Sequence, residues 1–363
     1  MEENGEQKGY IRLSYLAAGA ILLVFVFCLL AVGLGVHYGE MSNAIVATTS
    51  ATEKTTTTSA PIATTTETPL NPSDWRLPDT IVPSEYDLQV RPYLPSSSVT
   101  YEPSKNFTFD ANVTIKMICK KEAETIVMNL KNLIIDYIKL EKANGSPIKL
   151  QQNPYSIDKT LERVTVFPEQ KLLTNHSYIM TITYRGILSD SLGGFYRSKY
   201  EENGKTNFIN EFCLRWLAVT HFECCNARAA LPCFDSPEFK ASFRVTIIHP
   251  KDMVALSNED LESRSLKCFF REPGGWNRVV FHPTPRMSSY LLAFTVNAFE
   301  KRTSFTESDP QVMFRVWSPP GAQNETLFAT MSGPTVLDYY GKYFNEQFPL
   351  PKQGQILKTL FNP

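Results

Sequence analysis

The sequence predicts a mainly β protein held outside a membrane by a single transmembrane helix and a Ser/Thr-rich stalk. Three observations carry this prediction: an uncharged apolar run near the N-terminus, a tract dense in Ser and Thr, and a two-residue alternation beyond it. With 363 residues, 43% hydrophobic and 20% charged, the chain has room for one large or two ordinary domains. The formal net charge of -1 and the lack of dense Lys/Arg runs argue against nucleic acid as a partner.

The apolar run is Tyr15–Val36, which carries no charge. As a helix it would extend roughly 33 Å, enough to span a bilayer core, and it lacks the polar stripe of a buried core helix. Lys8 and Arg12 precede it and no Lys or Arg follows before Lys54, so the positive-inside rule makes residues 1–14 a cytoplasmic tail. The expected location is the plasma membrane, as a type II protein with residues 15–36 as signal anchor. The alternative is a cleaved signal peptide, which also leaves the remaining chain outside.

Residues 37–73 form the predicted stalk. Ser and Thr dominate it and large apolar residues are nearly absent, so the tract cannot bury enough surface to fold. Its Ser, Thr and Pro content indicates an O-glycosylated spacer, with an unmodified flexible linker as the alternative. Beyond it lie five N-x-Ser/Thr sequons, which predict N-glycosylation of an exported domain. The sequon asparagines are Asn106, Asn112, Asn144, Asn175 and Asn324.

Strands dominate the predicted ectodomain. Apolar residues recur at every second position from Phe107 to Met117, which indicates a half-buried strand, and Asn106 and Asn112 both fall on its polar side. Tyr178–Tyr184 and Phe243–His249 alternate in the same way, and turn residues such as Asn144-Gly145 separate such runs. Further short candidates are 279–281, 290–296 and 312–317. The pattern predicts an antiparallel sandwich or saddle of sheets over residues 74–300.

The period changes near the C-terminus. Thr326–Tyr343 has helical spacing, with a potential interruption at Gly333-Pro334, and Phe348–Lys352 follows as a Pro-rich segment. A domain that turns helical and stops soon afterwards has the pattern of an incomplete domain, over residues 301–363. Without the rest of that domain to pack against, the apolar residues of this segment would form an exposed patch.

Catalytic motifs are absent from the sequence. None of the five histidines is followed by another four positions on, and no G-x-S-x-G, Walker or G-x-G-x-x-G motif is present. His221-Phe222-Glu223 has the form H-x-E, but no C-x-x-C completes a deaminase-type zinc site. Cys28 lies in the membrane segment, and the other six cysteines permit several disulfide pairings that spacing cannot choose between. Residue chemistry alone indicates no enzyme and no metal site. 

Five segments resemble motifs of the zinc aminopeptidase family that contains aminopeptidases N and A. Arg215–Pro237, which includes T-H-F-E-C-C-N-A-R-A-A-L-P-C-F-D-S-P, is similar to the family signature T-Q-F/M-E/Q-x-x-x-A-R-x-x-F-P-C-F-D-E-P. The others are Trp75–Leu88, Gly194–Ser198, Met287–Phe294 and Phe348–Lys352. Each motif is weak alone, but the set keeps the family's order and approximate spacing over residues 75 to 353. The anchor and stalk also resemble those of the cell-surface members.

This resemblance implies a β saddle followed by the start of a thermolysin-like catalytic domain. It implies an activity, the removal of N-terminal residues from peptides by zinc-bound water, and it allows homo- or heterodimers. In the family the P-L-P-K segment leads to G-A-M-E-N, HExxH and a distant Glu, none of which this sequence contains. The chain as given is therefore expected to hold no zinc and to be inactive alone.

Two substrate-binding residues carry over from the resemblance, and no catalytic residue does. Glu223 matches the position that holds the substrate's free α-amine, where a carboxylate suits a cation. His221 matches a position lining the pocket for the first side chain, where Gln or Asp is usual, which leaves the side-chain preference open. Cys224-Cys225 and Ser236 also depart from the family pattern. The alternatives without a functional role are that Glu223 is an ordinary loop carboxylate and that His221 is a loop or core histidine whose hydrogen bonds are satisfied within the fold.

Three functions stay open at this point. The first is the N-terminal part of a membrane aminopeptidase, as a fragment, a truncated isoform or a faulty gene model. The second is a naturally short, non-catalytic glycoprotein that binds peptides or a full-length relative. The third is a mucin-like adhesion protein with a β sandwich, against which the ordered motifs argue.

Overall fold

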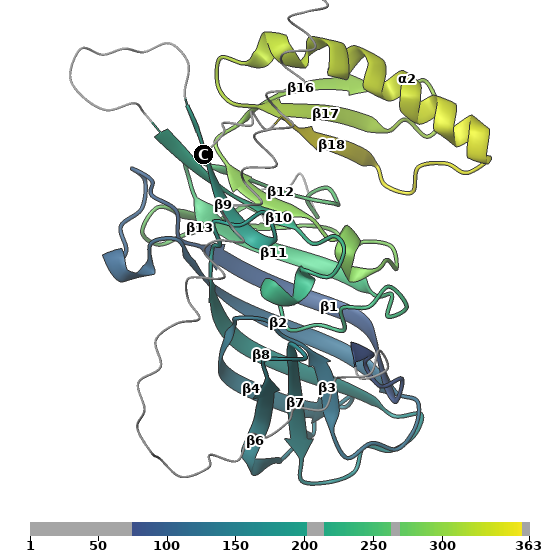
Figure 1. Ribbon diagram of the computed structural model, residues 1–363. Coiled ribbons are helices and arrows are strands. Elements are labelled where there is room, and N and C mark those ends of the chain that lie inside the picture. The colour runs from purple at the N-terminus through teal and green to yellow at the C-terminus, as the bar shows by residue number, and fades with distance from the viewer. Residues whose placement is uncertain (1–74, 202–213, 263–268, 358–363) are drawn as a thin grey trace, which may run out of the picture. The chain divides into compact units, whose positions relative to one another are not determined.

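An eight-stranded sheet forms the centre of the protein (Figure 1). The structure, a computed structural model, describes residues 75–201, 214–262 and 269–357. In the sheet order β13-β14-β11-β1-β2-β8-β4-β5, all neighbours are antiparallel except β1 and β11, which run parallel. Its strands are β1 Ile81–Pro92, β2 Thr108–Cys119, β4 Ile134–Lys142, β5 Pro147–Ile148, β8 Ser177–Ile187, β11 Ser242–Pro250, β13 Phe269–Glu272 and β14 Trp276–Val280.

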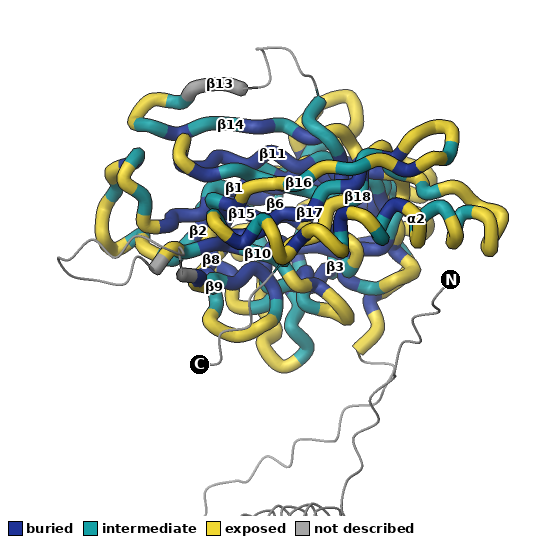
Figure 2. Tube along the Cα trace, turned by 90° about the horizontal axis from the view of Figure 1, so that it is seen from above, coloured by how far each residue is buried: buried dark blue, intermediate teal, exposed yellow. Residues whose placement is uncertain are grey.

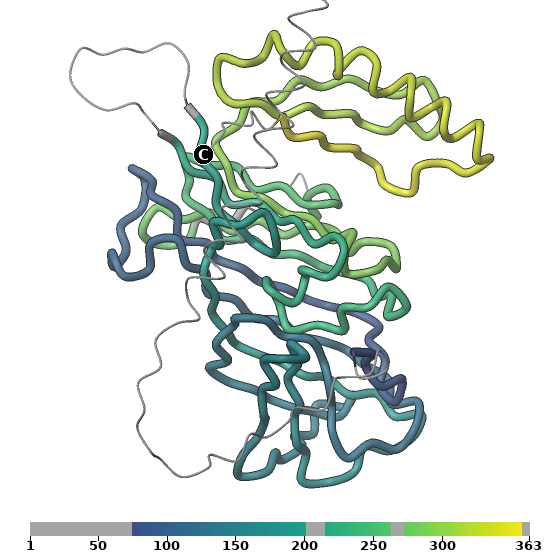
Figure 3. The backbone as a smooth tube through the Cα atoms, viewed as in Figure 1, coloured from purple at the N-terminus to yellow at the C-terminus, as the bar shows by residue number. Residues whose placement is uncertain are grey.

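The parallel pair corrects the prediction of an antiparallel domain. Glu85 of β1 is paired with Ser242 of β11, so segments far apart in the chain lie side by side (Figure 3). Parallel neighbours require a long crossover connection, and here the strands β2 to β10 provide it. A two-residue alternation identifies a strand but not its direction.

Two smaller sheets complete the β domain. One has the order β12-β15-β10-β9 and the other the order β3-β7-β6. Their strands are β3 Ile126–Asn129, β6 Leu150–Asp158, β7 Arg163–Pro168, β9 Gly194–Glu201, β10 Leu214–His221, β12 Val254–Ser257 and β15 Phe294–Asn297. The predicted strand over 290–296 is wrong in its first half, because Ser289–Leu291 form a 3-10 turn (η4) before β15 begins.

One continuous core joins these sheets. The alternation predicted for β2 is confirmed: every second residue from Phe109 to Met117 is buried, and the residues that alternate with these are half-buried or exposed. Figure 2 shows the buried residues concentrated along the central strands, whereas the surface loops are exposed. Hydrophobic burial across several sheets is therefore the main stabilising contribution to this domain.

A separate three-stranded sheet follows the β domain in the chain. It has the order β16-β17-β18, with β16 Glu300–Phe305, β17 Met313–Ser318 and β18 Lys352–Ile356. Between β17 and β18 lie a short 3-10 turn, η5 (Gln323–Thr326), and the helix α2 (Leu327–Phe344), which covers one face of this sheet (Figure 1).

The helix runs close to the predicted Thr326–Tyr343. The interruption expected at Gly333-Pro334 is wrong, since α2 passes through both residues. A Cβ at position 333 would lie 2.1 Å from the Phe314 ring, so a glycine is required for the helix to approach β17 this closely.

The predicted anchor and stalk lie outside the described residues, as do Cys28, Cys213 and Cys268. Within the three described ranges no helix is long and apolar enough to span a membrane. The domain limits of 74–300 and 301–363 stay predictions, and the third sheet begins at Glu300.

Candidate functional site

The end of strand β10 carries both residues expected to bind substrate. Its partner β9 pairs His221 with Gly194. Gly194 has a φ of +72°, and a Cβ there would lie 2.8 Å from the Cβ of Ala229, so a side chain would strain the backbone and collide with the turn after β10. This close approach gives a structural reason for the glycine in the G-F-Y-R-S segment.

His221 and Glu223 are both exposed at this strand end. Phe222, which separates them, is buried and packs its ring edge against Phe294 at a centroid distance of 6.0 Å. The Nδ1 of His221 lies 2.9 Å from the carbonyl oxygen of Leu192; since a carbonyl only accepts, this bond places the imidazole proton on Nδ1. The inward Phe222 thus fixes the segment while its two neighbours face solvent.

A tight turn follows directly. The backbone N–H of Asn226 donates to the carbonyl oxygen of Phe222 at 2.9 Å, and the Asn226 side-chain amide donates to that of Glu223 at 3.4 Å. The Glu223–Cys224 peptide bond is cis. The Glu223 side chain is exposed, so its carboxylate can accept charge-assisted hydrogen bonds from a cation such as a peptide ammonium group.

A buried ion pair anchors the far side of the turn. Arg228, in the 3-10 turn η3 (Ala227–Ala229), donates through Nε to Asp235 at 3.0 Å and through a terminal nitrogen to Glu162 at 3.3 Å. Ser289 donates to the other Asp235 oxygen at 2.6 Å. Burial opposes the charge on Arg228, but the hydrogen bond to Asp235 and the charges of Asp235 and Glu162 together outweigh it, and the pKa of Arg228 is raised. Asp235 is therefore a structural residue of the signature segment.

A cavity of about 730 Å³ lies next to this strand, between the β domain and the third sheet. Val219 and Thr220 of β10 line it, but His221 and Glu223 do not. Its walls include the apolar side chains of Phe281, Phe294 and Trp317. The volume falls within the range of small-molecule pockets, roughly 300–1,000 Å³.

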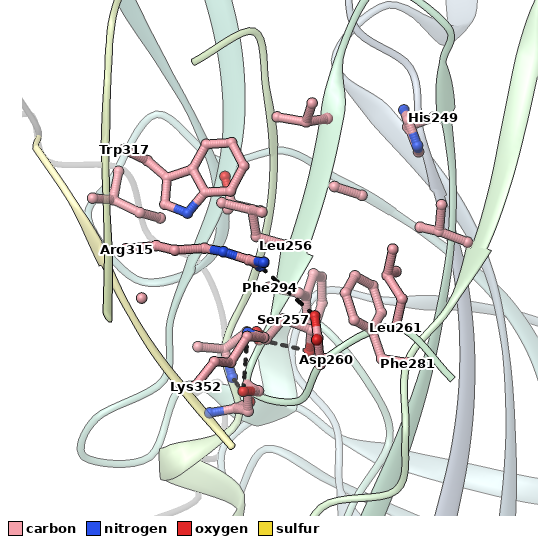
Figure 4. Close-up of a pocket in the computed structure, with 18 of the residues that line it drawn as sticks. His249, Leu256, Ser257, Asp260, Leu261, Phe281, Phe294, Arg315, Trp317 and Lys352 are labelled. Carbon is pink, nitrogen blue, oxygen red and sulfur yellow. Dashed lines mark hydrogen bonds and ion pairs between the residues drawn. The ribbon is translucent and has the colours of Figure 1, made fainter. Parts of the chain in front are cut away.

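Charged residues cross this cavity between the two sheets (Figure 4). Arg315 of β17 approaches Asp260 at 3.7 Å, and the Lys352 ammonium donates to the carbonyl oxygens of Ser257 at 2.6 Å and Asn258 at 3.1 Å. Burial lowers the pKa of Lys352 to about 8. These contacts tie the third sheet to β12 and to the loop that follows it.

His249 also lines the cavity. Its side chain is buried, its Nδ1 bonds the carbonyl oxygen of Pro250, and its Nε2 has no hydrogen-bond partner within the described part of the chain. Burial lowers the pKa of this histidine, so it is held neutral. From the sequence, His249 was predicted only as a strand residue. Arg315 and Asp260 were missed because nothing local marks a strand residue and a loop residue that meet in the fold.

Comparison with known proteins identifies the family. A model described as "Peptidase M1 N-terminal domain" matches residues 82–291, which include β10 and the turn after it. The chain is 35% identical to Aminopeptidase N of Canis lupus familiaris over 297 residues, or 79% of this chain and 28% of that protein. It is 33% identical to Aminopeptidase N of Bos taurus over 98% of this chain and 36% of that protein. The chain belongs to the M1 peptidase family.

This M1 chain spans about a third of the length of the relatives it matches. The matched domain contains His221, Glu223 and the Arg228–Asp235 pair, whereas Arg315 and Lys352 lie beyond it. The resemblance on which these site residues rested is confirmed at the level of the family. Their roles as substrate-binding residues stay predictions.

A zinc ion, implied by the family, does not fit the residues that the structure describes. No group of three or more His, Cys, Asp or Glu side chains within the three described ranges is placed to hold a metal ion. Tetrahedral zinc sites in enzymes take three protein ligands, so no chemical step is assigned to a metal here.

The predicted glycosylation sites differ in their surroundings. Asn106, Asn144, Asn175 and Asn324 are exposed. Asn112 is half-buried in β2, and its side-chain amide donates to the Thr183 hydroxyl of β8 at 3.0 Å. A glycan is attached to the same Asn112 side-chain nitrogen that donates to Thr183, so glycosylation there would disturb this hydrogen bond.

Proposed function

We propose that this chain supplies the N-terminal β domain and the amine-binding loop of a membrane-anchored zinc aminopeptidase. The observation that carries the proposal is the exposed Glu223 just beyond the end of β10, inside the region that the M1 domain model matches. Its carboxylate would accept hydrogen bonds from the free α-amine of a peptide, and His221 would border the first side chain. The names of the relatives, all aminopeptidases, support peptide N-termini as the substrate class.

The chain by itself is proposed to be inactive. Its sequence contains no HExxH, so it lacks the two histidines and the general-base glutamate that such a centre requires. The proposed setting is a type II plasma-membrane glycoprotein anchored by Tyr15–Val36, with glycans on the stalk and on the five sequons. Pairing with a second subunit, of the same or a related chain, is part of the proposal.

A domain exchange tests the role of Glu223. Residues 75–357 would replace the matching region of canine Aminopeptidase N, and turnover of aminoacyl chromogenic substrates would be measured. A charge-assisted hydrogen bond contributes about 1.5–3 kcal/mol, so Glu223→Ala should lower kcat/KM roughly 10- to 150-fold. Glu238→Ala, at another exposed carboxylate of the same segment, is the matched control. Equal activity of the two variants would refute the assignment.

A second candidate function is a non-catalytic glycoprotein that binds a full-length relative. The exposed face of α2 favours it, with Phe328 81%, Tyr343 68% and Phe344 63% accessible. Contiguous exposed apolar side chains commonly mark a surface that contacts another polypeptide. Co-sedimentation of the purified chain with canine Aminopeptidase N, lost in Phe328→Ser, would support this function; no co-sedimentation would exclude it.

A further inference from the structure

Two adjacent cysteines occupy the turn after Glu223. Cys224 and Cys225 are both exposed, and their sulfur atoms lie 3.0 Å apart. The hydrogen bond from the Asn226 N–H to the Phe222 carbonyl closes the turn around them, so the two side chains are held next to each other. The hydrogen bond with Cys224, and burial after it, raise the pKa of the Cys225 thiol.

The other two cysteines in the described ranges have the opposite surroundings. Cys119 and Cys233 are fully buried in the core. The Cys119 thiol donates to the carbonyl oxygen of Lys121, and burial raises the pKa of the Cys233 thiol well above its ordinary value. Buried, protonated thiols are unreactive, so these two residues serve as internal controls for exposure.

We propose that Cys224 and Cys225 form a redox-active pair that closes a disulfide between neighbouring residues on reaction with a glutathione-type disulfide. One thiol, as thiolate, attacks a sulfur of the small disulfide, forms a mixed disulfide and releases one small thiol. The second cysteine, as thiolate, then attacks the sulfur of the first cysteine, which forms the Cys224–Cys225 bond, breaks the mixed disulfide and releases the other small thiol. Two cysteine thiols are oxidised, one small disulfide is reduced, and the two cysteine protons end on the two released thiols.

Chain geometry makes this bond labile. The Cys224–Cys225 peptide bond is trans, so the two Cα atoms lie about 3.8 Å apart. Ordinary disulfides join Cα atoms about 4.4–6.8 Å apart, and departures from this range store strain that favours reduction. An exposed, strained disulfide belongs to the reversible kind, and the pair is thus a switch and not a structural link.

The position of the pair couples it to the loop. Formation of the Cys224–Cys225 disulfide would fix the backbone immediately after Glu223 and change the position of the Glu223 carboxylate. This consequence rests on the proposed function, whereas formation of the bond does not, and the experiment below reads the bond alone.

The test treats the purified full chain with oxidised glutathione and then alkylates free thiols under native conditions. Mass spectrometry of a non-reducing digest should find the peptide with Cys224 and Cys225 lighter by two hydrogen atoms and unalkylated, and brief reduction should restore both alkylations. Cys224→Ser and Cys225→Ser should each keep one glutathione adduct, because the resolving thiol is gone. Unalkylated Cys119 and Cys233 would confirm that each sample is folded.

Three results would overturn the proposal. Both thiols could remain open to alkylation after oxidation, or the wild-type chain could keep a stable glutathione adduct. Alternatively, either cysteine could be found bonded to Cys213 or Cys268.

Discussion

Removing the Asp235 carboxylate tests how the signature segment is held. In Asp235→Ala the Arg228 guanidinium would lose its closest partner, at 3.0 Å, and Ser289 would lose its acceptor, at 2.6 Å. The Asp235 side chain is 1% exposed and that of Arg228 is 12% exposed. Water therefore cannot replace the missing carboxylate, and the arginine would be left as a buried, poorly compensated charge.

The size of the effect follows from this burial. Breaking a buried ion pair by removing one partner costs about 3–5 kcal/mol. Arg228 keeps Glu162 at 3.3 Å and the main-chain oxygen of Asp235 at 3.2 Å, which places the expected loss at the lower end, about 3 kcal/mol. For a domain of this size, roughly 2–4 °C of melting temperature is lost per kcal/mol, so a decrease of about 6–12 °C is expected.

Thermal unfolding of the purified chain, followed by circular dichroism, measures this loss. Asp79→Ala is the matched control, since Asp79 forms a largely exposed pair with Lys121 and should leave the melting temperature unchanged. The double variant Arg228→Met/Asp235→Asn removes both charges and keeps an acceptor for Ser289, so it should lose less stability than Asp235→Ala. A loss for Asp235→Ala no larger than the control's would refute the reasoning.

Three further predictions concern single residues. Gly194→Ala should lower the free energy of unfolding by about 1–3 kcal/mol, because it combines a left-handed backbone with a 2.8 Å contact to Ala229. Gly145→Ala, with positive φ but open space, should lower it less when both variants are measured by denaturant titration. Burial lowers the pKa of Lys352 from 10.5 to about 8, so between these values the unfolded chain binds more protons and stability should rise with pH by about 3 kcal/mol relative to Lys352→Met. A parallel pH dependence of the two proteins would contradict this. Burial also lowers the pKa of His249 below 6.5, so acidification through 6.5 should destabilise the wild type relative to His249→Gln, and an unchanged difference would show that the histidine is not held neutral.

Local pattern predicted the strands well. The alternation through β2 and β8 matches their buried faces, because each strand packs one side against a core. The same alternation could not reveal that β1 and β11 run parallel, since strand direction depends on the path of the chain between them. The sequence pattern also did not predict that α2 continues through Pro334. The close approach of Gly333 to the Phe314 ring is a tertiary contact, and such a contact leaves no local signal in the sequence.

The candidate site divides in the same way. Glu223 and His221 came from the resemblance of a contiguous segment, and no periodicity marks either of them. The Asp260–Arg315 approach joins the loop after β12 to β17, and Lys352 meets the backbone at Ser257 only once the third sheet is in place. Such long-range meetings leave no local signal in one sequence.

The central claim is that this chain carries a recognition loop without a catalytic centre. Zinc content and turnover of aminoacyl chromogenic substrates, measured together on the purified full chain, test it most directly. We predict no bound zinc and no turnover, because the sequence lacks HExxH. Stoichiometric zinc with turnover that a chelator abolishes would contradict the account.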